Sequence, residues 1–229
     1  MHDRCLLYYI TDRTAFGVDE ATRRESLLEK ITEAALAGVD YIQLRERDLS
    51  TRELELLARK SVALLNDLRA ENRELKTALL INSRTDIAIS VGADGVHLRS
   101  DDISPREVTT IWTKRSPIVG VSCHSPEEVS RAAENDATLA VFAPVFEKNY
   151  APRTPPRGLA QLSEACTAKI PVLALGGITL ENARSCLDAG AAGIAAIRLF
   201  QENSIAGIVA ALPQFGSRYG SEMISQHQP

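Results

Sequence analysis

Short apolar runs alternate with longer amphipathic segments along the whole chain. The short runs are rich in aliphatic and β-branched residues, which is typical of buried strands. We expect strands at residues 6–11, 41–44, 78–81, 95–98, 118–122, 139–145, 172–175 and 194–197. The longer segments place apolar residues at helical spacing. We expect helices at residues 21–37, 50–68, 86–91, from 104 onward, 126–134, 158–166, 180–188 and 205–212.

Local signals mark the ends of these elements. Ser50 is followed three residues later by Glu53, the pattern of a capping box at the start of a helix. Gly38, Gly92 and Gly190 each come at the end of an expected helix, and a turn of two or three residues then leads to the next strand. Glycine tolerates the left-handed backbone that commonly ends a helix, so we interpret these turns as structural.

Eight strand-then-helix units indicate a parallel sheet with right-handed crossovers. The expected fold is therefore α/β, a single (β/α)8 TIM barrel over residues 1–215, followed by a flexible C-terminal tail at 216–229. The rival is an open doubly wound sheet, which usually has a glycine-rich turn after its first strand. Here that loop is Thr11-Asp12-Arg13-Thr14 and contains no glycine.

Composition narrows the function class. The 229 residues are 45% hydrophobic, 24% charged and 5% aromatic, which excludes a disordered or collagen-like chain. The net charge of −4 argues against a nucleic-acid partner, because phosphate backbones require a basic face. No apolar stretch approaches the length of a membrane span, and the first apolar run is too short for a signal peptide. Four widely spaced cysteines indicate reduced thiols and a cytoplasmic protein.

Polar residues gather where the expected strands end, which is the side of a barrel that carries chemistry. Gln43, Arg45 and Arg47 alternate along one strand and therefore face the same way, as an anion site would require. The turn Gly176-Gly177 precedes a helix and, with Ile197 and Arg198 after the last strand, forms a candidate phosphate site. A simple tight turn would explain the two glycines equally well.

Other strand ends supply further candidates, each with a plainer explanation. Asn82 follows the third strand. Ser122 ends the fifth strand, and His124 lies just beyond it, where it is placed for proton transfer. Asp101 and Asp102 suit a metal or a solvated loop. Lys148 lies in the proline-rich segment 146–157, which has the length of an active-site lid. His97 lies just before a strand end and is a candidate ligand or a core histidine.

Several of these segments together resemble the thiamine phosphate synthase and TenI family over residues 6–213. The residues that carry the resemblance are Tyr9–Asp12, Gly38–Glu46, Ile81–Asn82, Ala93–Leu98, Gly120–Ser122 with His124, Pro144–Phe146 and Ala174–Ile178. The resemblance implies a (β/α)8 barrel that joins hydroxymethylpyrimidine diphosphate to a thiazole phosphate and releases diphosphate. It also implies Mg²⁺ as cofactor.

Roles for individual residues follow from the same resemblance. Gln43, Arg45, Arg47, Asn82 and Ser122 would hold the diphosphate, and Asp102 would ligate Mg²⁺. Gly177 and the end of the last strand would hold the thiazole phosphate. The chain departs from the synthase pattern at Arg47 (usually Lys), Ser83 (usually Asp), Arg99 (usually Gly), Arg198 (usually Ser) and the segment Glu147–Tyr150. A neutral serine is a poor ligand for a hard cation, so Ser83 weakens the metal prediction.

These departures leave three hypotheses. The first is a thiamine phosphate synthase, a transferase acting on small phosphorylated pyrimidine and thiazole substrates. The second is a TenI-like tautomerase that moves a proton on a thiazole carboxylate phosphate without a metal, with His124 as general acid/base. The third is a barrel that binds a phosphorylated ligand without catalysis. We expect neither a nucleic-acid nor a membrane partner, and a homodimer remains open.

Overall fold

The computed structural model describes residues 4–113, 116–147 and 155–212. Eight parallel strands close into a barrel in chain order, with β1 paired to β8. The strands are β1 Leu6–Ile10, β2 Tyr41–Leu44, β3 Ala78–Asn82, β4 Gly95–Leu98, β5 Ile118–Cys123, β6 Leu139–Phe142, β7 Val172–Leu175 and β8 Gly193–Ala196. The single (β/α)8 barrel is therefore confirmed. The expected tail at 216–229 lies outside the described residues.

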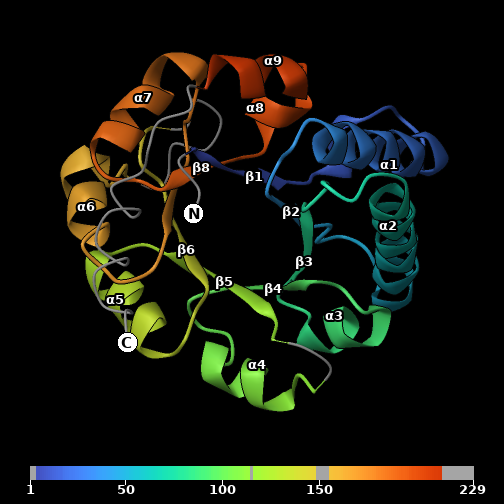
Figure 1. The fold of residues 1–229 in the computed structure, drawn as a ribbon, viewed down its shortest axis with the longest axis horizontal. Helices are drawn as coiled ribbons and strands as arrows, with labels where there is room; N and C mark the ends of the chain where they lie inside the picture. Colours follow the sequence, from blue (N-terminus) through green and yellow to red (C-terminus); the bar gives the residue numbers. More distant parts are fainter. Residues whose placement is uncertain (1–3, 114–115, 148–154, 213–229) are drawn as a thin grey trace.

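Helices surround the barrel on all sides (Figure 1). Those that the sequence predicts are α1 Glu20–Leu36, α2 Thr51–Glu71, α3 Thr85–Val91, α4 Pro105–Ile111, α5 Pro126–Glu134, α6 Gly158–Ala165, α7 Leu180–Asp188 and α9 Ile205–Ala211. Two short elements were not predicted, the 3-10 helix η1 Arg13–Ala15 and the helix α8 Arg198–Gln201. Both directly follow a strand, η1 after β1 and α8 after β8.

The strand expected at 139–145 is shorter in the structure and ends at Phe142. Pro144 has no backbone N–H, so it cannot donate to a strand ladder. The next residue, Val145, instead donates its N–H to the Leu175 carbonyl oxygen at 2.9 Å. The segment after β6 therefore lies against the end of β7.

Two hydrophobic clusters form the core, one on each side of the sheet. The interior of the barrel is filled by Leu6, Tyr8, Ile10, Ala78, Leu80, Leu139, Val141, Leu173, Ala192 and Ala195. The larger cluster lies between the barrel and its helices and includes Leu27, Ile31, Leu57, Leu65 and Phe200. Strand residues alternate between the two clusters, as a sheet with both faces covered requires.

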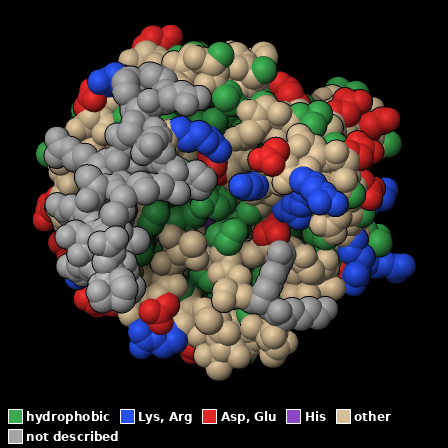
Figure 2. Space-filling view, viewed as in Figure 1, with side chains coloured by type: hydrophobic (Ala, Val, Ile, Leu, Met, Phe, Trp, Pro, Cys, Tyr) green, Lys and Arg blue, Asp and Glu red, His purple; other side chains and the backbone are tan. Residues whose placement is uncertain are grey.

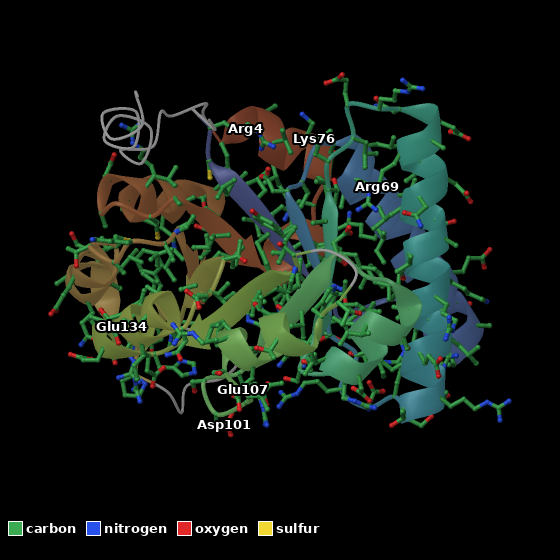
Figure 3. The ribbon with its side chains drawn as sticks, turned by 60° about the horizontal axis from the view of Figure 1, so that its bottom comes forward. Arg4, Arg69, Lys76, Asp101, Glu107 and Glu134 are labelled. Atoms are coloured by element: carbon green, nitrogen blue, oxygen red, sulfur yellow. The ribbon has the colours of Figure 1, made fainter. Side chains whose placement is uncertain are left out.

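The predicted capping box and the three helix-ending glycines are confirmed, whereas α2 extends to Glu71, three residues beyond its predicted end. Ser50 and Glu53 form the capping box of α2, with Ser50 N–H donating to Glu53 Oε2 at 3.1 Å. Gly38, Gly92 and Gly190 have φ of 85°, 71° and 104°, the left-handed backbone expected of them. These turns lie at the amino-terminal ends of the strands, the end at which Figure 3 shows Arg4 and Lys76.

Two further observations concern membrane spans and cysteines. No described helix is long and apolar enough to cross a membrane. Cys5, Cys123, Cys166 and Cys186 are all free thiols. Basic and acidic side chains lie next to each other on the face seen in Figure 2, in keeping with the modest net charge.

Candidate active site

A pocket of about 500 Å³ opens at the carboxyl ends of the strands, between β7, β8 and β2. Six of the predicted site residues line it, namely Gln43, Arg45, Gly176, Gly177, Ile197 and Arg198. They come from two distant parts of the chain, residues 43–45 and 176–198. The pocket also contains Thr179, Glu181, Glu202 and Asn203, to which the sequence pattern assigned no role. A concave site with a few converging polar groups is where a small ligand is expected to bind.

The Gly176–Gly177 turn forms one wall of this pocket. Gly177 has φ of 65°, and a Cβ there would lie 2.5 Å from the Glu147 carbonyl oxygen. Only glycine therefore fits without displacing backbone. The turn's carbonyl groups are engaged, since Gly176 O accepts from Phe146 N–H at 3.0 Å and Gly177 O accepts from the Asn182 amide at 2.9 Å. The Gly177 N–H has no partner among the described residues, so it is available to an anion.

Helix α8 begins beside this turn, directly after β8, which pairs with β7. Its first residue, Arg198, lies in the pocket, and the preceding Ile197 provides no side-chain cap. The first-turn N–H groups of a helix have no partner within the helix. Phe200, which is fully buried, stacks at 5.7 Å between ring centres against Tyr9 of β1. Gln201 also donates to the Asp12 carbonyl oxygen at 2.6 Å, so both contacts hold α8 to the start of the chain.

A buried ionic network positions Arg45 at the end of β2. Thr11 donates to Glu46 Oε1 at 2.5 Å and accepts the Arg45 N–H at 3.0 Å. Glu46 also pairs with the guanidinium of Arg13 at 3.2 Å, and Arg13 is only 3% exposed. The hydrogen bonds that Arg13 donates to Asp48 raise the pKa of Arg13 above its ordinary value despite burial, so the charge is permanent. The sequence analysis does not predict this network. Glu46 directly follows Arg45, and adjacent residues of a strand point to opposite sides of the sheet, so the pattern places Glu46 on the helix side.

Gln43 and Asn82 meet at the floor of the barrel mouth. Gln43 Nε2 donates to Asn82 Oδ1 at 2.7 Å, which leaves Gln43 Oε1 buried without a hydrogen-bond partner in the described structure. An unpaired buried acceptor is costly unless a ligand satisfies it. Arg47, predicted to face the same way, is exposed and makes no ion pair with a described residue.

Ser122 lies on β5 and contacts a histidine inside the barrel. Its Oγ is 2.9 Å from His97 Nε2, and His97 Nδ1 is 2.7 Å from the Tyr8 hydroxyl. His97 is 3% exposed, and burial, helped by the Arg45 charge and opposed by Asp102, lowers its pKa to about 3. His97 is therefore neutral near pH 7. His97 therefore fits the interpretation as a core histidine, and each of its ring nitrogens contacts a polar side chain.

His124 lies beyond the end of β5 and is exposed. Its Nδ1 is 2.8 Å from the Ala143 carbonyl oxygen, and its backbone N–H donates to Glu128 at 2.7 Å. A carbonyl oxygen can only accept, so Nδ1 carries a proton and the neutral ring has an unprotonated Nε2. That nitrogen is free to accept a proton.

Asp102, the predicted metal ligand, is held by Arg99. Arg99 N–H donates to Oδ2 at 2.8 Å and its guanidinium contacts Oδ1 at 3.1 Å. Burial raises the pKa of Asp102, but the Arg99 N–H, the nearby Ser83 hydroxyl and the guanidinium outweigh burial and lower it. Ser83 Oγ lies beside this carboxylate, is buried and has no partner in hydrogen-bonding geometry. Asp101 is exposed at the edge of the molecule (Figure 3).

Within the described ranges, no three His, Cys, Asp or Glu side chains are placed to hold a metal ion together. Two further arginines that follow strands, Arg84 after β3 and Arg99 after β4, are engaged by aspartates. Arg84 pairs with Asp86 at 2.6 Å, and Arg99 pairs with the two aspartates that follow it. Lys148 and most of the proposed lid at 146–157 lie outside the described residues.

The fold and this pocket define a (β/α)8 barrel with a polar pocket at the carboxyl ends of its strands. In barrels of this class, phosphate sites commonly lie after strands 7 and 8. A family model described as thiamine monophosphate synthase matches residues 7–200. The chain belongs to this family, which is a family of transferases in thiamine biosynthesis.

Individual relatives agree with the family match. The chain is 40% identical over 197 residues to a putative thiamine-phosphate synthase 2 of Aquifex aeolicus, covering 86% of this chain and 97% of that one. It is 38% identical to a thiamine-phosphate synthase of Roseiflexus sp., covering 84% and 76%. The solved thiamine phosphate pyrophosphorylase from Pyrococcus furiosus superposes with a TM-score of 0.72 at 30% identity, covering 92% and 95%.

Proposed function

We propose that this chain is a thiamine phosphate synthase, which joins hydroxymethylpyrimidine diphosphate to a thiazole phosphate and releases diphosphate. The observation that carries the proposal is a pocket that brings Gln43 and Arg45 together with Gly177 and Arg198. A reaction between two phosphorylated substrates needs two anion sites within one cavity. The pocket has a polar or cationic group at each of two walls, which suits that requirement.

The chemistry follows from the leaving group. When the bond between the pyrimidine CH₂ and diphosphate breaks, the bond electrons leave with diphosphate and a pyrimidine-stabilised cation remains, which the thiazole nitrogen attacks. The barrier is lowered by neutralising the departing oxygens and by orienting the nucleophile. We assign Gln43, Arg45, Arg47, Asn82 and Ser122 to the diphosphate, and Gly176, Gly177, Ile197 and Arg198 to the thiazole phosphate.

The family resemblance implies Mg²⁺, and the donors present fit a metal held mainly by substrate. Mg²⁺ is usually bound through one or two carboxylates together with substrate phosphates. Asp102 would hold it, and Ser83 Oγ beside that carboxylate is buried without a partner. When bound, the ion would neutralise charge on the leaving diphosphate. Arg99 already contacts both oxygens of Asp102 and would have to yield one of them.

His124 favours a second candidate function, the thiazole tautomerase. Its ring is exposed and is oriented by the contact between Nδ1 and the Ala143 carbonyl oxygen, which suits it to move a proton between two carbon or nitrogen atoms of a bound ligand. This reaction needs one phosphate site and no metal. Tautomerisation does not require the additional polar groups of Gln43, Arg45 and Asn82. We therefore place the tautomerase second.

The partners and the cellular setting belong to the same proposal. The substrates are small phosphorylated pyrimidines and thiazoles, and the free cysteines suit the reducing cytoplasm. Neither a nucleic acid nor a membrane surface is needed for this chemistry, and a homodimer would be compatible with it.

The test is to supply purified protein with both substrates and Mg²⁺. Formation of thiamine phosphate with stoichiometric diphosphate release supports the synthase. Isomerisation of thiazole carboxylate phosphate without metal, abolished by His124→Ala, would replace it with the tautomerase. Binding without turnover would leave a ligand-binding barrel.

A matched glycine pair tests the pocket itself. Gly177→Ala should abolish turnover, because the new Cβ would lie 2.5 Å from the Glu147 carbonyl oxygen. Gly92→Ala is the control, since φ is similar at 71° but nothing lies within 4 Å of the added Cβ. It should cost about 1 kcal/mol of stability and leave turnover intact. Equal kinetic losses in both variants would argue against a substrate site at the Gly176–Gly177 turn.

A further inference from the structure

Three polar side chains are hydrogen-bonded in a row across the interior of the barrel. Tyr8 on β1, His97 on β4 and Ser122 on β5 are linked by contacts of 2.7 Å and 2.9 Å. Tyr8 is fully buried, His97 is 3% exposed, and Ser122 is half-buried at the carboxyl end of its strand. Only Ser122 therefore reaches the barrel mouth.

The sequence makes room for this arrangement. Gly120 lies two residues before Ser122 and pairs with His97 across the β4–β5 ladder. A Cβ at Gly120 would lie 2.8 Å from His97 Nδ1, so the ring occupies the space that a side chain would fill. The centres of the Tyr8 and His97 rings are 5.6 Å apart, so the two rings are in close contact.

The direction of each hydrogen bond follows from counting protons. Burial raises the pKa of Tyr8 well above its ordinary value and lowers that of His97 to about 3, so Tyr8 keeps its proton and His97 has one N–H. If His97 Nδ1 carried that hydrogen, the Tyr8 O–H would have no acceptor among the described residues. A buried donor without an acceptor is strongly disfavoured.

The remaining arrangement satisfies every group. Tyr8 O–H donates to Nδ1, and Nε2–H donates to Ser122 Oγ. The Ser122 oxygen then accepts from inside the barrel, and its own hydrogen is left to point away from His97. A hydroxyl fixed in this way is a preorganised donor toward an anionic oxygen.

We propose that Tyr8 and His97 are positioning residues that hold Ser122 as an obligate hydrogen-bond donor to the substrate's leaving phosphate oxygens. His97 does not move a proton in this arrangement. The part that concerns the leaving group rests on the proposed function, whereas the proton arrangement in the free protein does not.

The first test needs no variant and no substrate. Nitrogen NMR of imidazole-labelled protein reports which ring nitrogen is protonated, and the chain has only four histidines to assign. His97→Gln identifies the signal. We expect Nε2 protonated and Nδ1 bare between pH 5 and pH 8. A proton on Nδ1, or a doubly protonated ring near pH 7, would overturn the proposal even if the protein proves to be a synthase.

The second test is a double-mutant cycle on kcat, with KM for the diphosphate substrate measured in parallel. Ser122→Ala should lower kcat by on the order of 100-fold. Tyr8→Phe should lower it by about tenfold in the wild-type background, with little change in KM, and by less than about twofold in Ser122→Ala. The same loss in both backgrounds would mean that Tyr8 acts only on structure, and would sink the idea.

A matched control removes a neighbouring hydroxyl. The Tyr41 ring lies 5.7 Å from that of Tyr8 but is not part of the chain of hydrogen bonds. Tyr41→Phe should therefore leave kcat within about twofold of wild type. If no turnover is found at all, the same cycle is measured as the affinity for inorganic diphosphate. If Tyr8→Phe and Ser122→Ala show no coupling in diphosphate affinity, the positioning role is overturned. If they are coupled, the positioning role is supported independently of the synthase reaction.

Discussion

At the scale of single residues, the site depends on buried polar groups that lack one hydrogen bond in the protein. Gln43 Oε1 is a buried acceptor without a partner among the described residues, and Ser83 Oγ is buried beside Asp102 but outside hydrogen-bonding geometry. Each such atom costs about 1–3 kcal/mol unless a ligand or an ion satisfies it. They lie beside Asn82 and Asp102, two of the residues that we assign to the diphosphate and the metal.

Ser83→Asp tests the metal assignment. A second carboxylate beside Asp102 should strengthen the field on a hard cation, so half-maximal activity should need about tenfold less Mg²⁺. The measurement is a Mg²⁺ titration of initial rate at saturating substrates. Ser130→Asp, exposed on α5, adds the same charge away from the site and should leave the titration unchanged. An unaltered Mg²⁺ midpoint in Ser83→Asp would count against a metal at this position.

At the scale of elements, the four-residue helix α8 is held by contacts outside itself. Phe200 packs against Tyr9, and Gln201 reaches the Asp12 carbonyl oxygen. So short a helix has little stability of its own. The position of Arg198 in the pocket therefore depends on how well Phe200 is anchored.

Phe200→Leu should loosen this anchor. We expect it to lower the free energy of unfolding by up to about 1.5 kcal/mol. We also expect it to weaken binding of inorganic phosphate about three- to tenfold, because a small displacement of a binding group lowers affinity. Phe142→Leu is the control, because Phe142 is equally buried but lies on β6, outside the pocket lining. Calorimetric titration with phosphate compares the two. Similar phosphate affinities in both variants would contradict a phosphate site at α8.

At the scale of the whole molecule, the buried neutral His97 links stability to pH. Its pKa is about 3 in the folded barrel and about 6.5 when unfolded. Between these values the unfolded chain binds the extra proton, so stability is fully present above pH 6.5 and falls with acidification. Near pH 5 this contributes a slope of up to about 1.4 kcal/mol per pH unit.

Urea unfolding at a series of pH values tests this linkage. His97→Gln keeps an N–H near the position of Nε2 but cannot titrate. The free energy of unfolding should therefore fall less steeply for His97→Gln than for wild type between pH 6 and pH 4. The carboxylates, including Asp102, are present in both proteins and cancel in the comparison. Parallel curves would show that His97 is protonated in the folded state or exposed to solvent.

Local pattern in the chain determines much of the architecture. Strand and helix signals are short-range, because a buried strand needs consecutive apolar residues and a helix needs apolar residues at helical spacing. The capping box at Ser50 and the left-handed glycines at the turns are equally local. Helix α8 and η1 escaped prediction because they are too short to show a period.

The sequence by itself thus determined the eight-unit barrel, the end of it that carries the polar residues and the family. Only the tertiary structure decided which polar residues share one pocket, because closing the barrel through the β1–β8 pair brings Arg45 after β2 and Gly177 after β7 into the same lining. It also decided which charges are already neutralised, as for Arg84 and Arg99. The direction of the hydrogen bonds from Tyr8 through His97 to Ser122 likewise depends on burial and on distances, which no linear pattern encodes.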